Sequence, residues 1–314
     1  MIRKTSFPDR ADRLSLISQD LVLCKSYPLL KIGKINDEHF EDLRKKINSY
    51  IYTNLSNFYY DETINFDSSL FESQPNQIRG LPNITPNGLI LPKKPTCSEY
   101  NNIHSSVVKI FQEFKLDKHV SNIHAPINIR LVDGAKSKND QRPHSSTKMH
   151  SDIWAGEPSN SIAVFIPIFS DEKNINVKWI EPLTFPEKLM QPLSDFNDGK
   201  DIVNGGMEYE VDFSPGNIIL VDPYLIHATN KVRDLLRLSI DFRFITQKVI
   251  DKDLIAPGTR QDNYLSYEEW SDIGQGRSLT SALPLTKFSN ETNRRQNKYA
   301  AEYGVIKIKD GNPY

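Results

Sequence analysis

The chain has 314 residues, with 39 lysines and arginines against 40 aspartates and glutamates, so its formal net charge is -1. This balance excludes an overall electrostatic field that would attract DNA or RNA. No apolar run approaches the length of a membrane-spanning helix, and the opening MIRKTSFPDRADRLSL has no apolar signal segment. The two cysteines do not make a disulfide framework. We expect a cytoplasmic protein that binds neither nucleic acid nor membrane; its oligomeric state stays open.

Residues 1–118 are expected to form a helical elaboration. Apolar residues recur at helical spacing over 36–56, with charged residues between them, which predicts an amphipathic helix. Prolines and glycines over 63–96 indicate a loop. A second helix is predicted to begin near Thr96, because Thr96 and Glu99 have the spacing of a capping box.

Strands follow these helices. Their apolar patterns predict strands at 127–132, 161–169, 217–222 and 237–244. Pro167 indicates an edge or a bulge, and the alternation over 237–244 predicts a half-buried strand. This order favours an α+β fold with a mainly β core, a sandwich or barrel, over βαβ units. We predict one domain over 1–314, with core strands at about 120–250 and a C-terminal extension of short helices and loops over 250–314.

Of the seven histidines, only His150 has a carboxylate two residues later, Asp152. On a strand these two side chains would share a face and could meet one ion. His227 lies just beyond an apolar strand, where a third ligand can face a cavity. Two histidines and one carboxylate form the facial triad of non-haem Fe(II) oxygenases, which leaves positions open for a 2-oxo acid and O2. The alternatives are a surface histidine at 150 and a hydrogen-bonded core histidine at 227.

Arg237 begins the next strand, and Ser239 shares its side of that strand. A guanidinium can bind a carboxylate through two parallel hydrogen bonds, and a hydroxyl can add a third. A buried arginine needs such a partner, and a bound dicarboxylate would supply it. The alternative is an arginine that pairs with Asp241 or faces solvent.

With these residues the chain resembles the phytanoyl-CoA-dioxygenase-like 2-oxoglutarate oxygenases. It is most similar to the branch from streptomycin-type and other carbohydrate biosynthetic clusters. The resemblance covers about 127–245 and rests on His150-Ser-Asp-Ile-Trp154, Gly156, Pro158 and Pro167, then His227, Asn230, Arg237, Ser239, Asp241 and Arg243. That family usually has aromatic residues in the strand after the first motif, where this chain has Ile162, Val164 and Phe165. No substrate pocket is therefore carried over from that strand.

The resemblance implies a double-stranded β-helix, also called a jelly roll or cupin-like fold. It implies Fe(II) bound by His150, Asp152 and His227, and 2-oxoglutarate held by Arg237 with help from Ser239. The expected reaction uses O2 to hydroxylate or otherwise oxidise a small biosynthetic metabolite, such as a sugar derivative, and releases succinate and CO2.

Four further residues are candidate substrate contacts: Trp154, Asn128, Arg130 and Arg243. Trp154 could instead be ordinary aromatic packing. Asn128 and Arg130 suit a structural hydrogen bond or salt bridge, and for Arg243 we favour a pairing with Asp241 or Asp222. The stretch 133–149 leads into the metal ligands and suits a lid that orders on binding.

Three other functions fit parts of this pattern. A metal-binding cupin-like protein that binds or isomerises carbohydrate would share the ligands without needing Arg237 and Ser239. A zinc hydrolase would need a nearby general base, and no HExxH-type base lies around His150. A partner-binding protein would need no metal.

Overall fold

The computed structural model describes residues 5–59, 75–82, 84–134, 141–170, 177–232, 234–247, 264–285, 303–309 and 312–313. Its larger sheet has eight strands among these residues, in the order β1-β2-β8-β5-β10-β3-β11, and β4 pairs with β10. All its pairings are antiparallel. The bounds are β1 (Leu23–Tyr27), β2 (Leu30–Lys34), β3 (Val120–His124), β4 (Asn128–Asp133), β5 (Ser161–Ser170), β8 (Asn217–Val221), β10 (Leu236–Thr246) and β11 (Tyr264–Ser266).

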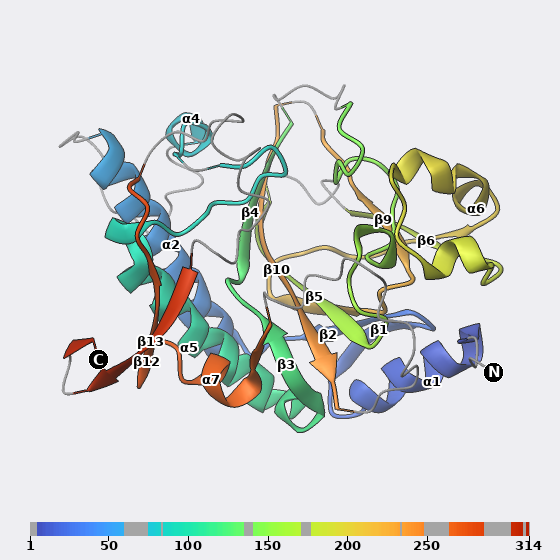
Figure 1. Cartoon of the computed structure of the whole chain (residues 1–314), viewed down its shortest axis with the longest axis horizontal. Helices are drawn as coiled ribbons and strands as arrows, with labels where there is room; N and C mark the ends of the chain where they lie inside the picture. The colour runs from blue at the N-terminus through green and yellow to red at the C-terminus, as the bar shows by residue number, and fades with distance from the viewer. Residues whose placement is uncertain are drawn as a thin grey trace.

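A smaller antiparallel sheet faces the inner side of this large sheet. Its order is β7-β6-β9, with bounds β6 (Val177–Glu181), β7 (Met207–Tyr209) and β9 (Ile226–Thr229). Phe165 and Ile219 of the large sheet share one buried cluster with Val177 and Trp179 of the small sheet. Figure 1 shows β6 and β9 on the side of β5 and β10 that lies away from the long helices. The core therefore consists of two antiparallel sheets that share an apolar cluster.

Helices cover the other face of the large sheet. Figure 1 shows α2 (Asp37–Tyr59) and α5 (Cys97–Glu113) side by side there. Even-numbered residues of β5 and β10, such as Val164 and Phe242, share a buried cluster with Ile47 and Phe111 of these helices. The remaining helices are short: α1 (Phe7–Ile17), α4 (Pro75–Arg79), α6 (Lys200–Asn204), α7 (Tyr267–Ser271), and 3-10 turns η1 (Lys94–Thr96), η2 (Leu116–His119), η3 (Ile153–Ala155), η4 (Glu187–Met190) and η5 (Phe196–Gly199). No helix of the described chain is long and apolar enough to cross a membrane.

The sequence places both long helices correctly, including the start of α5 near Thr96, but the predicted capping box differs. Thr96 is the N-cap residue, yet its side chain makes no capping hydrogen bond. Its hydroxyl instead donates to the Lys93 carbonyl and accepts from the Lys93 N–H, at 3.1 Å in both cases. The predicted capping box with Glu99 is therefore wrong, because the 3-10 turn η1 precedes the helix and engages the threonine.

The strand β10 is buried on both faces, so the prediction of a half-buried strand is wrong. Its apolar side packs on the helices, and its polar side carries Arg237, Ser239, Asp241 and Arg243 beneath the small sheet. The bulge predicted from Pro167 is confirmed. The register between β10 and β5 shifts where Ser239 opposes Pro167. β5 itself pairs with β8 on its other side, so it is not an edge strand.

The C-terminal extension contains strands as well as the expected short helix. β12 (Arg277–Ser281), β13 (Tyr303–Lys309) and β14 (Asn312–Pro313) form a third antiparallel sheet. The prediction of helices and loops alone is therefore incomplete for this region. Residues 248–263 and 286–302 lie outside the described chain.

The N-terminal helix α1 is fixed to the core by a buried ion pair. Arg10 and Asp222 are both fully buried, and the Arg10 Nε donates to the two Asp222 carboxylate oxygens at 3.2 and 2.9 Å. The Arg10 Nη2 also donates to the Ser159 carbonyl at 2.6 Å. Arg13, one turn later, donates to the carbonyls of Ser159 and Ser161 at 2.9 and 2.6 Å. Asp222 directly follows β8 and Ser161 begins β5, so α1 is bound to the end of one core strand and to the start of another.

Candidate metal centre

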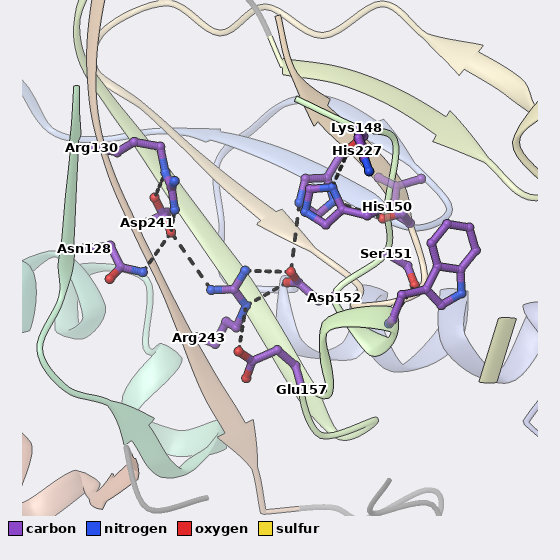
Figure 2. A network of polar contacts seen from close by, with 12 residues as sticks. Asn128, Arg130, Lys148, His150, Ser151, Asp152, Glu157, His227, Asp241 and Arg243 are labelled. Atoms are coloured by element: carbon purple, nitrogen blue, oxygen red, sulfur yellow. Dashed lines mark hydrogen bonds and ion pairs between the residues drawn. The ribbon is translucent and has the colours of Figure 1, made fainter. Parts of the chain in front are cut away.

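His150, Asp152 and His227 converge at one point, as Figure 2 shows. One ligand atom from each lies within 4.8 Å of the others. The Nε2 of His227 is 4.0 Å from the Oδ1 of Asp152, and the two imidazole centroids are 4.4 Å apart. The three residues are 8%, 1% and 6% exposed. The prediction that these distant residues meet is therefore matched by the geometry, and neither histidine is a surface residue.

The backbone explains how these residues meet. His150 and His227 form an isolated antiparallel bridge, with reciprocal N–H to carbonyl hydrogen bonds of 2.9 and 2.7 Å. Asp152 is not on a strand, contrary to the prediction. Its backbone is helical at φ -63 and ψ -30, and its N–H donates to the Pro223 carbonyl at 3.1 Å. The Ile153 N–H lies 3.5 Å from the same carbonyl, and the chain continues from there into η3.

Backbone carbonyls orient both imidazoles. The Nδ1 of His150 lies 2.7 Å from the Lys148 carbonyl, and the Nδ1 of His227 lies 3.2 Å from the Leu225 carbonyl. A carbonyl only accepts, so each Nδ1 carries the proton and each Nε2 keeps its lone pair. Burial, followed by the charge of His227, lowers the pKa of His150 to about 3. Burial likewise lowers the pKa of His227. Both rings are therefore neutral near pH 7, the form that binds metals.

Aromatic rings fix these imidazoles further. The Phe196 ring stacks on His150, with centroids 4.4 Å apart and an interplanar angle of 5°. Trp179 and Phe165 lie against His227 with centroid separations of 5.4 and 5.9 Å. This apolar surround limits water around the site and strengthens charge interactions within it.

The third candidate ligand, Asp152, is paired with Arg243. The Nε of Arg243 donates to Oδ2 at 2.8 Å and its Nη2 donates to Oδ1 at 2.6 Å (Figure 2). The favoured pairing of Arg243 with Asp241 is present as an ion pair at 4.0 Å, whereas Asp222 is bound by Arg10. The shorter contacts of Arg243, to Asp152, were not predicted. Burial raises the pKa of Asp152, but Arg243 and His227 outweigh it and hold the carboxyl well below its usual range.

Arg130 and Asn128 of β4 reach across to Asp241 of β10. Arg130 Nη2 and Asn128 Nδ2 each donate to Oδ1 of Asp241 at 3.0 Å. These are the structural contacts that the sequence favoured for both residues. Burial raises the pKa of Asp241, yet Arg130 lowers it below its usual value, so the carboxyl stays ionised. Both Arg130 and Asn128 also line the cavity beside the triad.

Arg237 and Ser239 lie on the same inner face of β10, each 1% exposed. The guanidinium carbon of Arg237 is 4.9 Å from the centroid of the Phe213 ring. The Ser239 hydroxyl has no hydrogen-bond partner among the described residues. Burial, and then Arg130, lowers the pKa of Arg237 to about 9, so it is still a cation near pH 7. Arg237 is therefore not on a solvated face.

A cavity of about 180 Å³ opens beside the triad. His150, Asp152 and Arg243 line it, together with Arg130 and Asn128. Other lining residues had no place in the sequence prediction: Arg142, His144, Glu157 and Phe196. Glu157 is buried and accepts a hydrogen bond from the Tyr264 hydroxyl at 2.9 Å. Its position between Gly156 and Pro158 of the motif was the signal that could have identified it.

Trp154 lies in an apolar cluster and not at the cavity, where a substrate contact would place it. It is fully buried in a cluster with Ile153, Leu189 and Phe196, and it is not among the residues that line the cavity. A Cβ built on Gly199 would lie 2.2 Å from the Trp154 ring, so the indole packs tightly against backbone. Ordinary aromatic packing describes this contact. Residues 135–140 of the expected lid, 133–149, lie outside the described residues, whereas His144 and Ser146 near its end line the cavity.

No family model and no curated protein matches this chain. Solved structures that match this chain include AviO1 from Streptomyces viridochromogenes Tue57, at 11% identity and TM-score 0.42, covering 80% of this chain and 100% of that one. The α-ketoglutarate-dependent non-haem epimerase SnoN from nogalamycin biosynthesis matches at 9% identity and TM-score 0.35, covering 76% and 83%. EctD from S. alaskensis with bound Fe matches at 11% identity and TM-score 0.39, covering 74% and 78%. At this low similarity the matches assign no activity to this chain, and its function is argued from the geometry of its own site.

Proposed function

We propose that this protein is an Fe(II)- and 2-oxoglutarate-dependent dioxygenase that hydroxylates or otherwise oxidises a small metabolite and releases succinate and CO2. The convergence of one ligand atom from each of His150, Asp152 and His227 within 4.8 Å carries the proposal. The donor set fits Fe(II): two neutral imidazoles with free Nε2 lone pairs and one ionised carboxylate form a facial triad. Bound iron would supply O2 activation coupled to decarboxylation of 2-oxoglutarate.

Arg237 is proposed to bind the distal carboxylate of 2-oxoglutarate, with Ser239 as a second contact. Both are buried on the inner face of β10, the strand whose Arg243 contacts Asp152. The planar fork of a guanidinium matches a carboxylate, and its charge favours an anionic ligand. The unbonded Ser239 hydroxyl could add a donor. On the inner face of β10, Arg237 would then bind the distal carboxylate of 2-oxoglutarate, while Arg243 contacts the metal ligand Asp152.

The small-molecule substrate is proposed to enter the cavity beside the triad. Its wall is polar, with Asn128, Arg130 and Arg243 among the donors. Such a wall suits a hydroxylated metabolite such as a sugar derivative from a carbohydrate biosynthetic pathway. In this proposal the two facing sheets form the double-stranded β-helix that the sequence resemblance implies.

The direct test mixes Fe(II) and 2-oxoglutarate with the protein in the absence of O2. A visible charge-transfer band is expected, and a metal-binding cupin-like protein without oxygenase chemistry would give none. Succinate formation under O2 is then measured with a panel of candidate substrates. His150→Ala and Arg237→Ala should lose both the band and the succinate. Equal background from wild type and both variants would reject the assignment.

A further inference from the structure

The contact between Arg243 and Asp152 has a particular form. The Nε and Nη2 edge of the guanidinium donates two parallel hydrogen bonds, one to each carboxylate oxygen, at 2.8 and 2.6 Å. This is the fork geometry of strong arginine–carboxylate pairs. Figure 2 shows the guanidinium on one side of Asp152 and the two imidazoles on the other.

This fork restricts how Asp152 can bind an ion. Each carboxylate oxygen has one lone pair directed toward the other oxygen's side and one directed away. A guanidinium fork uses the inner lone pairs of both oxygens, and a metal chelated by both oxygens needs the same two lone pairs. While the fork is in place, Asp152 can give a metal only an outer lone pair. Oδ1, which lies 4.0 Å from His227 Nε2, is the oxygen placed to do so.

Other carboxylates prevent Arg243 from moving away. Its Nε is 4.0 Å from Glu157 Oε1, and its Nη1 is 4.0 Å from Asp241 Oδ1. Asp241 is itself held by Arg130, and Glu157 accepts from Tyr264. A mostly buried guanidinium surrounded by three acids would lose ion-pair energy in any other position. The fork is therefore fixed from several elements of the fold.

We propose that Arg243 is a positioning residue that confines Asp152 to a single bond with the metal. This inference rests on the proposed function and deepens it. A triad with one bond per ligand leaves three positions of an octahedron, enough for a 2-oxo acid that takes two and for O2. A chelating Asp152 would take one of these positions and compete with 2-oxoglutarate.

One test uses the wild-type protein loaded with Mn(II). The waters bound to Mn(II) can be counted from the broadening of its EPR lines in ¹⁷O-enriched water. Three waters are expected if each ligand forms one bond with an octahedral ion. Two waters would mean that Asp152 chelates the metal despite the fork, and would overturn the inference. This measurement requires no variant, so a folding defect cannot obscure it.

A second test compares Arg243→Lys and Arg243→Gln with wild type in Mn(II) affinity and in anaerobic titration of the Fe(II) complex with 2-oxoglutarate. Lysine keeps the positive charge but cannot form the fork. Both variants should bind Mn(II) with an affinity within about threefold of wild type. They should need at least about tenfold more 2-oxoglutarate to develop the charge-transfer band, a change in affinity of about the size expected for one lost hydrogen bond. Wild-type 2-oxoglutarate affinity in Arg243→Lys would overturn the inference, as would loss of Mn(II) binding in both variants. If wild type itself shows no band, the proposed function fails instead.

Discussion

The two faces of β10 have opposite chemistry although both are buried. From Leu236 to Phe244 the outer face carries only apolar side chains, which share a buried cluster with residues of α2 and α5. The inner face carries three charged residues and a serine, which lie beneath the small sheet. The apolar face needs no specific partners, whereas each charged residue on the inner face needs one. For Asp241 and Arg243 the partners come from β4 and from the turn that holds Asp152. A strand that buries charges at such cost is a candidate for ligand binding.

The largest expected effect is on the outer face. Phe242→Ala removes a fully buried ring that lies 5.6 Å from the Phe111 ring and 6.1 Å from the Trp270 ring. We expect the free energy of unfolding to fall by about 3–5 kcal/mol, measured by urea denaturation. The affinity of the folded fraction for metal should stay unchanged. A parallel loss of metal affinity would show that the two faces are not independent.

On the inner side, His227→Ala should lower metal affinity by more than about a hundredfold, the upper range for residues that only support a ligand. The loss of one of three ligands is the reason, and succinate formation should fall with it. Metal titration by calorimetry measures the effect. His104→Ala, a buried histidine on α5 remote from the triad, is the matched control. Equal losses in both variants would contradict a specific site.

Arg237→Gln should raise the concentration of 2-oxoglutarate needed for half-maximal succinate formation by about tenfold to a hundredfold. Glutamine can still hydrogen-bond a carboxylate, but it lacks the charge and the fork. Metal affinity should remain at the wild-type value because Arg237 contacts none of the triad in the described chain. An unchanged 2-oxoglutarate requirement would remove Arg237 from the proposal.

A smaller effect is expected on the pH dependence of stability, through His104 on α5. His104 is fully buried, and its ring nitrogens have no hydrogen-bond partner among the described residues. Burial lowers its pKa from 6.5 to about 3. Between these values the unfolded chain binds a proton that the folded chain does not, so stability falls as pH drops below 6.5, by about 2 kcal/mol at pH 5. His104→Leu should lose this part of the pH dependence. The free energy of unfolding is measured with urea at pH 7 and pH 5, and an equal loss in wild type and His104→Leu would contradict the prediction.

Several features of the site could be predicted from residue types and spacing. The His150 and Asp152 pair, the late His227 and the alternation of β10 are local patterns, and each has a chemical reason. The structure brings the first three together as expected. Arg237 and Ser239 likewise share the inner face because a strand alternates its side chains.

The partners of the charged residues could not be predicted. Arg243 meets Asp152, 91 residues away in the chain, because of the register between β5 and β10 and the turn after His150. Neither leaves a local signal. The spacing of Thr96 and Glu99 predicts a capping box, but the Thr96 hydroxyl donates to the Lys93 carbonyl before η1 instead. The inner face of β10 is buried by residues distant in the chain, such as Phe213, Arg130 and Asp152, which a pattern within one strand does not reveal.

The pair between Arg10 and Asp222 links a distant segment to the centre. Asp222 precedes Pro223, whose carbonyl accepts from the N–H of Asp152, and Asp222 Oδ1 accepts from the Tyr224 N–H at 3.1 Å. Anything that tightens the ligand segments should therefore also tighten the docking of α1, since thermodynamic linkage is reciprocal. Trypsin cleavage after Arg10 or Arg13 would then slow as the centre is loaded. The rate of cleavage within α1 would then report how much of the metal centre is occupied.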